Sequence, residues 1–575
     1  MYGFQITNAT LQTESTLLSE GKTIQYGEIT FQYYPLPKFE QDKLFYEDDQ
    51  KIVLLDGVIF NKRELMEGKS GTWKDIFEEL YRENPNTFFN ELRGSFCGAV
   101  LEKASLRLTA FTNHSGEKTV YYTVQNGIFI VASHNNILTQ TLRALQIPVE
   151  PDIRACRELI AYGSILAGKT PFQRVRRVFA GKYVTIFDGT AEEKRYHMFC
   201  NVPEHSLSLD ECIEELDKRF RKAVDRIFSK NEEYGYRSEC DLSAGTDSRL
   251  VAWVAHDLGY QNIINICYCH SGNLDHTVSQ KIAHRLKNEY VFIPMDGGDF
   301  LTEVDEMVDK FGGQVTYMIC TGANQAMKKI KNANVALCAT GLLGELAKGD
   351  WAKDQMHTPP CYIEHRYSPV VPLEPSLQEL GQYDNREQLN FYEYGLTLMY
   401  SSLLIRQQQC EGVSPFLDVD CLEFLFRIPI QFRASKQLIM KWMVKKYPEA
   451  AKYVWLTKRM PVTHAYYNKI YWPKVADDVR SFLVRCMNKG CRICHLPIQM
   501  TYKSEMNPVH TWYLTNSSLR NFMEEYYQKN IHLIQDEELR KVVETTYEKG
   551  YGVDRVQAIN LLAVFKRYFQ HGKVN

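Results

Sequence analysis

The sequence predicts an α/β protein with an N-terminal domain built on sheets and a second domain built on a doubly wound parallel sheet. In the first part, short runs rich in β-branched and aromatic residues, such as 51–60 and 119–133, are separated by Gly, Asn and Asp. Beyond about residue 235, strands alternate with helices, which is typical of a parallel sheet. A chain of 575 residues also needs more than one hydrophobic core.

The N-terminal half contains one clear helix among its strands. In 72–84, apolar residues recur at helical spacing, so one face of this helix is expected to be buried. The polar stretch 201–211 then leads into a second amphipathic helix at 212–230. We place the domain boundary in this stretch, which gives domains of residues 1–203 and 204–575.

The second domain shows its strands and helices in alternation. Residues 236–259 are typical of a strand, a tight loop and a helix, and 262–295 of a strand, a helix and a strand. A further strand and loop follow at 334–346, and from about 385 the chain is mostly helical. Ligands of such sheets bind at the carboxyl ends of the strands, so the loops at that edge are the first place to look for a site.

Composition narrows the class of protein. A net charge of −2 and a pI near 6.7 provide no global positive charge, so we expect neither a nucleic acid nor a membrane as partner. No secretory signal and no long apolar run are visible, and 15 cysteines in such a chain are expected to be reduced thiols. These features predict a soluble cytoplasmic protein.

The most informative loop is LSAGTDSR, residues 242–249. Its small residues Ser243, Ala244 and Gly245 let the backbone approach a ligand, and their N–H groups with the following helix N-terminus would suit a phosphate. Asp247 offers an oxygen ligand for Mg²⁺. No lysine follows the glycine, so the Walker loop is absent. The alternative is an ordinary turn from strand to helix.

This loop resembles the S-G-G-x-D-S motif of the PP-loop ATP pyrophosphatases, and other segments extend the likeness along the chain. Residues 340–349 (TGLLGELAKG), 412–429 and 457–462 resemble the corresponding stretches of asparagine synthetases, as do 54–61 and 91–122 in the N-terminal half. The chain thus resembles the asparagine synthetase family from end to end. The resemblance implies an Ntn-hydrolase-like α+β sandwich domain, followed by a PP-loop (adenine nucleotide α-hydrolase-like) synthetase domain with a helical C-terminal part.

The resemblance also implies ATP and Mg²⁺ as cofactors. The expected ATP-binding residues are Leu242, Ser243, Ala244, Gly245, Thr246, Asp247, Ser248, Tyr268 and Gly341. Mg²⁺ would be held by Asp247 and Glu345. One alignment puts Glu345 at the family's metal-binding aspartate, and another, with a deletion, puts Gly344 there; in both, one of two family acids is missing.

Three cations are candidates for stabilising charge on phosphoryl oxygens or on a tetrahedral intermediate. Lys458 lies in the segment that matches the family's basic stretch, with an ordinary surface lysine as the alternative. Lys441 has weaker support. Arg249 could donate to a phosphate or a substrate carboxylate in bidentate fashion, or form a structural ion pair.

The glutaminase half departs from the family pattern at several positions. The family nucleophile is a cysteine at position 2, whereas this chain has Tyr2, whose phenol cannot replace a thiolate. The family's N-G-E stretch is Asp56-Gly57-Val58, and the family's aspartate in D-R-F-G is Asn113. We therefore expect an inactive glutaminase-like domain.

The expected function is an AMP-forming, ATP-dependent amide ligase that joins a small-molecule or peptide carboxylate to an amine. Relatives without the nucleophile include β-lactam synthetases and lasso-peptide cyclases. The amine stays open, as do a protein partner and a homodimer. The alternatives are a non-catalytic or regulatory homologue and a PP-loop sulfurtransferase or RNA-modifying enzyme. The cluster Cys486, Cys491, Cys494 and His495 suggests either a zinc site or a plain turn between helices.

Overall fold

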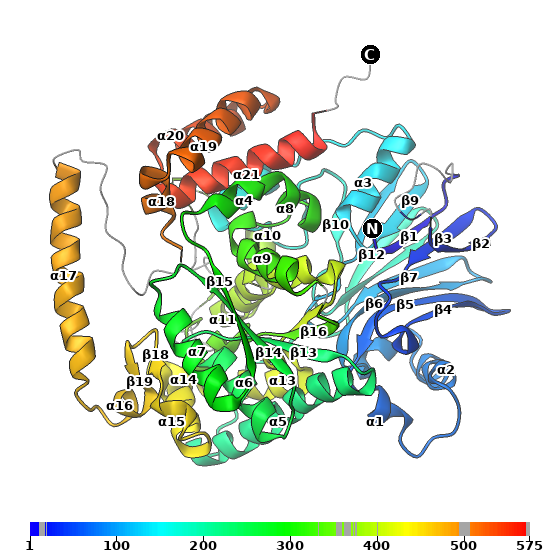
Figure 1. Cartoon of the computed structure of the whole chain (residues 1–575). Coiled ribbons are helices and arrows are strands. Elements are labelled where there is room, and N and C mark those ends of the chain that lie inside the picture. Colours follow the sequence, from blue (N-terminus) through cyan, green and yellow to red (C-terminus); the bar gives the residue numbers. More distant parts are fainter. Residues whose placement is uncertain are drawn as a thin grey trace.

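The computed structural model describes residues 1–10, 18, 20–331, 333–351, 359–360, 368, 370–371, 373, 376–399, 401–493 and 507–570. The strands of the N-terminal part lie on one side of the molecule, and a parallel sheet surrounded by helices lies on the other (Figure 1). Among the described residues, no helix has the length and apolar character needed to cross a lipid bilayer.

The N-terminal part contains two six-stranded sheets in which every pairing is antiparallel. The first sheet has the order β10-β8-β9-β1-β3-β2, with β1 Gly3–Thr7, β2 Lys22–Tyr26, β3 Ile29–Tyr34, β8 Tyr121–Gln125, β9 Ile128–Ala132 and β10 Arg176–Arg177. The second has the order β12-β11-β7-β6-β5-β4, with β4 Leu44–Glu47, β5 Lys51–Ile59, β6 Gly94–Glu102, β7 Arg107–Thr112, β11 Lys182–Phe187 and β12 Thr190–Arg195.

The two sheets pack face to face around an apolar core. Phe4, Ile6 and Phe31 from the first sheet and Leu54 and Ala99 from the second are fully buried in one cluster. Helix α2 (Trp73–Glu83) covers the outer face of the second sheet, and Thr72 begins it with a capping box. Helices α3 (Asn135–Ala144) and α4 (Ile153–Tyr162) cover the other outer face, so the layers run helix, sheet, sheet, helix.

The second part is a five-stranded parallel sheet of order β15-β14-β13-β16-β17. Its strands are β13 Arg237–Asp241, β14 Ile263–Cys269, β15 Glu289–Pro294, β16 Val335–Ala339 and β17 Glu411–Val413. Helices α5 (Leu209–Glu233), α6 (Asp247–Asp257) and α7 (Leu274–Leu286) lie on one face, and α8 (Val304–Phe311) and α9 (Thr321–Ile330) on the other (Figure 1). The predicted α/β class, with an antiparallel sandwich before a doubly wound parallel sheet, is confirmed.

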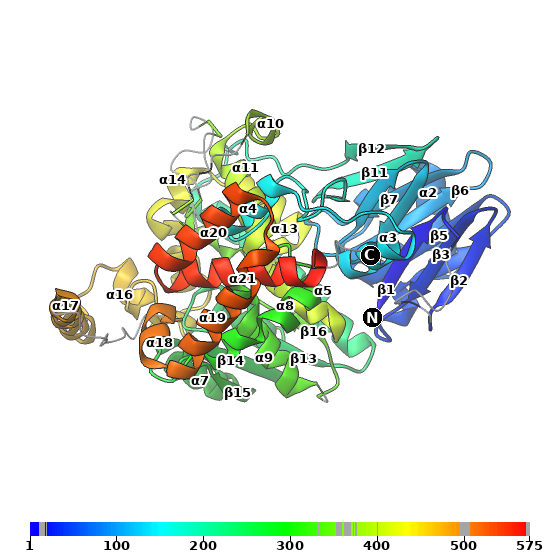
Figure 2. The same cartoon turned by 90° about the horizontal axis from the view of Figure 1, so that it is seen from above.

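The C-terminal region is helical, as predicted. Its helices, with the short α1 of the first part, are α1 Lys62–Met66, α10 Leu377–Leu380, α11 Arg386–Asn390, α12 Ser401–Leu404, α13 Val419–Arg427, α14 Ile430–Arg433, α15 Gln437–Lys446, α16 Val462–Tyr466, α17 Trp472–Ile493, α18 Val509–Thr515, α19 Ser517–Asn530, α20 Glu537–Lys549 and α21 Gly552–Tyr568. A two-stranded sheet joins β18 (Val454–Trp455) to β19 (Met460–Pro461). The long helix α17 stands apart from the rest in both views (Figure 1, Figure 2).

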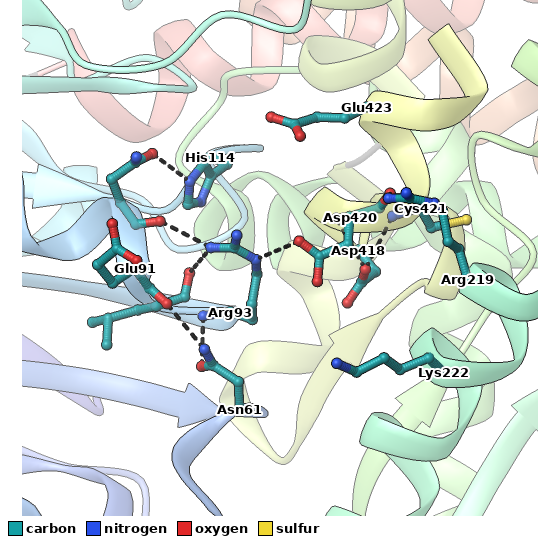
Figure 3. Close-up of polar contacts among 12 residues, drawn as sticks. Asn61, Glu91, Arg93, His114, Arg219, Lys222, Asp418, Asp420, Cys421 and Glu423 are labelled. Carbon is teal, nitrogen blue, oxygen red and sulfur yellow. Dashed lines mark hydrogen bonds and ion pairs between the residues drawn. The ribbon is translucent and has the colours of Figure 1, made fainter. Parts of the chain in front are cut away.

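Charged side chains hold the two parts together. Arg93 of the first part donates to Asp420 at 3.1 Å, at the start of α13 (Figure 3). Arg226 of α5 pairs with Asp418 and Asp420 at 2.8 Å and also contacts Glu64 of α1 at 2.8 Å. Arg226 therefore ties α1 and α13 to the same helix.

A second link between the parts is fully enclosed. The ammonium of Lys118 lies 2.7 Å from Glu411 of β17 and 3.5 Å from Asp56 of β5. Asp56 also accepts a hydrogen bond from Tyr33 at 2.7 Å. Burial alone would raise the pKa of Asp56, but Lys118 and Lys43 outweigh it and hold that pKa well below its usual range. The group is a buried charge cluster with balanced partners.

Replacing Lys118 by Met should destabilise the protein strongly, because Asp56 and Glu411 would lose their shared cation inside the molecule. The expected loss is about 3–5 kcal/mol in the free energy of unfolding. Chemical denaturation of wild type and variant measures it. Lys194→Met serves as the control, since Lys194 pairs with Glu192 in the solvent and such a pair contributes about 0–1 kcal/mol. Equal losses in the two variants would contradict the account.

Candidate active site

The predicted phosphate loop lies at the carboxyl edge of the parallel sheet. Strand β13 ends at Asp241, and α6 begins at Asp247. Inside the loop, the N–H of Ser243 donates to Ser248 Oγ at 3.1 Å, and the N–H of Gly245 donates to Ser243 Oγ at 3.1 Å. The N–H of Ala244 donates to Asp275 Oδ1 at 2.7 Å.

These bonds correct one prediction. The N–H groups of Ser243, Ala244 and Gly245 are engaged within the protein, because the serine hydroxyls and Asp275 fold the loop back on itself. An anion here would instead meet the first turn of α6, around Thr246 and the residues that follow it, where the helix dipole is positive. The side chain of Leu242, buried like Ala244, serves as core packing.

A second loop, residues 340–349, rests directly on the start of α6. A side chain at Gly341 would place its Cβ 2.2 Å from the backbone nitrogen of Ser248. A Cβ at Gly344 would lie 2.3 Å from Cγ of Asp247. Only glycine fits at these positions, and this close approach brings the loop that carries Glu345 against Asp247.

A lysine that the sequence reasoning missed completes this site. Lys348 Nζ lies 2.6 Å from Asp247 Oδ2 and 3.8 Å from Glu345 Oε1. Burial disfavours its charge, but the two carboxylates outweigh that effect and raise the pKa of Lys348. Burial, with the charge of Asp247, raises the pKa of Glu345 although Lys348 opposes this. The only sequence signal for Lys348 is its position three residues after Glu345, in the loop 340–349.

The donor set fits a Mg²⁺ ion bound together with phosphate oxygens. Glu345 Oε2 is enclosed and has no hydrogen-bond partner, and Asp247 lies beside it. Mg²⁺ commonly takes one or two carboxylates and completes its shell with water and substrate phosphates. In the described part of the chain, no group of three or more His, Cys, Asp and Glu side chains is placed to hold a metal. The two carboxylates would therefore supply the protein ligands of such a site.

Arg249 does not face the candidate site. Its guanidinium is completely buried and donates to the backbone carbonyls of Ala450 and Tyr453 at 3.1 Å, and to those of Ala244 and Val454 at 2.9 and 2.6 Å. The predicted contact with a phosphate or substrate is wrong, and so is a structural ion pair. Arg249 instead fastens the segment before Lys458 to the phosphate loop.

Lys458 and Lys441 line one groove of about 640 Å³ beside this segment. The N–H of Leu456 donates to the carbonyl of Ala244 at 3.2 Å, which places Lys458 two residues from a chain segment bonded to the phosphate loop. Lys441 pairs with Asp210 in the first turn of α5, at 2.7 Å, so its predicted role at the phosphates is not supported. Lys458 remains a candidate.

Tyr268 lies near the carboxyl end of β14. Its hydroxyl donates to Asp241 at 3.2 Å, and a Cβ at Gly322 would lie 2.2 Å from its ring. Arg406 contacts the same Asp241 at 2.6 Å and Glu239 at 2.7 Å. Sequence reasoning missed Arg406, because a single arginine in a helical region carries no signal.

The degenerate glutaminase positions surround two very small cavities. Tyr2 and Asp56 line one of about 20 Å³, together with Lys118, and the ring of Tyr2 packs on Tyr34 with centroids 5.0 Å apart. Asn113 lines the other, also about 20 Å³. Val58 is fully buried in the core, and a Cβ at the neighbouring Gly57 would lie 2.1 Å from the carbonyl of Ser95. A water needs about 10–15 Å³, so neither cavity has room for an amino acid.

The cysteine cluster falls partly outside the described residues. Cys494 and His495 lie outside them, whereas the backbone of Cys486 and Cys491 belongs to helix α17. The predicted turn between helices is therefore wrong for these two cysteines, because the helix continues to Ile493.

Comparisons with known proteins bear on both parts. Residues 38–197 match the family model described as a glutamine amidotransferase domain. No curated protein matches the sequence. Similar solved structures include "structure of the allosteric regulatory enzyme of purine biosynthesis" (11% identity, TM-score 0.23, 51% of this chain, 74% of that chain). Another is an NH3-dependent NAD synthetase from Campylobacter jejuni (16% identity, TM-score 0.19, 24% of this chain, 61% of that chain). A third is an NMN synthetase from Francisella tularensis (14% identity, TM-score 0.18, 37% of this chain, 92% of that chain).

An amidotransferase-type domain followed by a parallel sheet with this loop at its carboxyl edge fits an asparagine-synthetase-like architecture. The class that fold and site define is therefore an amidotransferase-type domain joined to a domain built on a doubly wound parallel sheet.

Lys348→Met should increase the affinity of the free protein for a divalent ion. Without the ammonium, Asp247 and Glu345 repel each other, and a metal relieves this repulsion. We expect Mn²⁺ to bind about tenfold more tightly or better in the variant, measured by electron paramagnetic resonance of free Mn²⁺. Lys436→Met is the matched control, since Lys436 pairs with Asp350 just beyond the loop. Unchanged or weaker Mn²⁺ binding in Lys348→Met would contradict the assignment.

Proposed function

We propose that the protein is an ATP-dependent amide-bond ligase that releases AMP and pyrophosphate and has no glutaminase activity of its own. The observation that carries the proposal is the meeting of two loops at the carboxyl edge of the sheet, with Asp247, Glu345 and Lys348 beside the N-terminus of α6. The amidotransferase-type domain at residues 38–197 supports amide chemistry in general.

In this proposal the chain binds the phosphates of ATP and positions a carboxylate against the α-phosphate. A carboxylate oxygen attacks that phosphorus, the bond to the β-phosphate breaks, and an acyl-adenylate and pyrophosphate form. The first turn of α6 and Lys348 would face the phosphate charge, and Lys458 would stabilise the transferring oxygens. When bound, Mg²⁺ at Asp247 and Glu345 would neutralise the phosphates. An amine then attacks the acyl carbon, and AMP leaves.

The proposed nitrogen source lies outside the N-terminal domain. By the resemblance, Tyr2 stands where the family has its nucleophile, and the two cavities lined by Tyr2 and by Asn113 hold about one water each. The amine would then belong to the substrate itself, to a peptide, to a small molecule or to free ammonia. We place such an enzyme in a specialised metabolite, peptide or polysaccharide pathway.

Exchange of labelled pyrophosphate into ATP, assayed with a panel of carboxylic acids, tests the reaction. Wild type should catalyse exchange with its own acid, and Asp247→Asn should lower the rate at least about a hundredfold, since a carboxylate that would hold Mg²⁺ against the phosphates is lost at a cost of about 3 kcal/mol. Asp257→Asn makes the same change at the other end of α6, where Asp257 pairs with Arg221, and should leave the rate unchanged. No exchange with any acid, together with no ATP binding, would favour the non-catalytic alternative.

Glutamine should not be consumed by the wild-type protein. With no thiolate and no pocket, release of glutamate should stay at the background of a heat-treated sample, measured by chromatography of the amino acids. Tyr2→Ala should leave pyrophosphate exchange unchanged, because Tyr2 belongs to the other domain. Steady release of glutamate by wild type would show that the account of the N-terminal domain is wrong.

A further inference from the structure

Exposed apolar side chains gather on helix α17 and on the short segment that precedes it. Of the twelve large hydrophobic residues that are exposed in the described part of the chain, eight fall between residues 467 and 487. They are Tyr467, Ile470, Trp472, Val475, Val479, Phe482, Leu483 and Met487, with exposed fractions of 43% to 72%. We call these eight residues the α17 patch. Single exposed hydrophobics are ordinary on a protein surface, but such a concentration marks an interaction site.

The patch forms one continuous stripe. At 3.6 residues per turn, Trp472, Val475, Val479, Phe482 and Leu483 share a face of α17. Among the side chains of this helix that the structure describes, the buried ones, Val484 and Asn488, project from the opposite side. The stripe thus lies opposite these buried side chains, along a helix that is about 33 Å long by its 22 residues.

The position of α17 leaves this stripe accessible. In Figure 1 the helix stands at the left edge of the molecule, and in Figure 2, turned by 90°, it again lies outside the body. The N-terminal sheets lie at the opposite end of the molecule in both views. A broad surface could therefore contact α17 without meeting the N-terminal domain.

The charges beside the stripe indicate which kind of partner it can bind. Between residues 469 and 492 the sequence has six Lys and Arg against two Asp, whereas the whole chain has a net charge of −2. One of the acids, Asp478, is paired with Arg459 and, at 3.3 Å, with Lys474. The exposed Arg480 and Lys489 lie at the two edges of the apolar stripe.

An apolar stripe edged by cations is typical of a helix that lies in a membrane interface. Its aromatic and aliphatic side chains enter the headgroup region, and lysine and arginine reach the anionic lipids. A second copy of this chain would bring two equally positive helices together, which charge repulsion disfavours. We propose that α17 docks the protein on an anionic lipid surface. The expectation of no membrane partner followed from the net charge of the whole chain, which this local excess of cations overrides.

Co-sedimentation of the full chain with lipid vesicles tests the proposal. Vesicles of equal parts phosphatidylcholine and phosphatidylglycerol should bind the protein, and pure phosphatidylcholine should bind it at least about tenfold more weakly, with the difference shrinking as salt is raised. The double variant Phe482→Glu with Leu483→Glu should lose about tenfold or more of the binding to anionic vesicles, because two exposed apolar groups that would enter the lipid are replaced by carboxylates.

The control makes the same charge change at exposed hydrophobics elsewhere, Phe187→Glu with Val202→Glu, and should bind like wild type. Arg480→Gln with Lys489→Gln should weaken binding and flatten its salt dependence while leaving the apolar stripe intact. Failure of wild type to sediment with anionic vesicles, or equal binding by the Phe482/Leu483 variant, would overturn the proposal. A dimer that light scattering detects without lipid, and that dissociates in the Phe482/Leu483 variant, would also overturn the proposal. The patch would then bind a second copy of the chain.

Discussion

One buried ammonium group links the two halves of this protein. Lys118 comes from the N-terminal sandwich and meets Glu411 of β17 at 2.7 Å and Asp56 of β5 at 3.5 Å. Strand β17 pairs with β16, and the N–H of Thr340 donates to Val413 at 2.9 Å. The loop that carries Glu345 starts at Thr340. This chain of contacts connects the candidate ATP site to Lys118, which also lines the small cavity beside Tyr2.

The site itself depends on close packing between backbones. Gly341 and Gly344 lie against α6 where any Cβ would collide, so Glu345 and Lys348 reach Asp247. Arg249 fixes the other side by donating to four backbone carbonyls. The backbones on both sides of the site are thus fixed by contacts within the protein, so little reorganisation of the two loops is expected on binding.

Much of the fold could be predicted from the sequence, because its signals are local. Alternating apolar runs indicated the sandwich, and strand–loop–helix repeats indicated the parallel sheet. The phosphate loop and the second loop were found because their small residues and acids lie in short, ordered motifs. The contacts of Arg249 and Arg406 could not be predicted, since both arginines meet partners far away in the chain: Ala450 and Val454 for the first, Glu239 and Asp241 for the second. The exposure of the α17 stripe could not be predicted from sequence, because an apolar stripe at helical spacing ordinarily faces a protein core.

Calorimetric titration with α,β-methylene-ATP and Mg²⁺ tests the central claim most directly, because this analogue binds but cannot be split between its α- and β-phosphates. The account predicts one binding site per chain for wild type, retained in the Tyr2→Ala variant and lost when Asp247 and Glu345 are both replaced by amides. Absence of binding in the wild type, or equal binding when both carboxylates are gone, would contradict the assignment of an ATP site to this edge of the sheet.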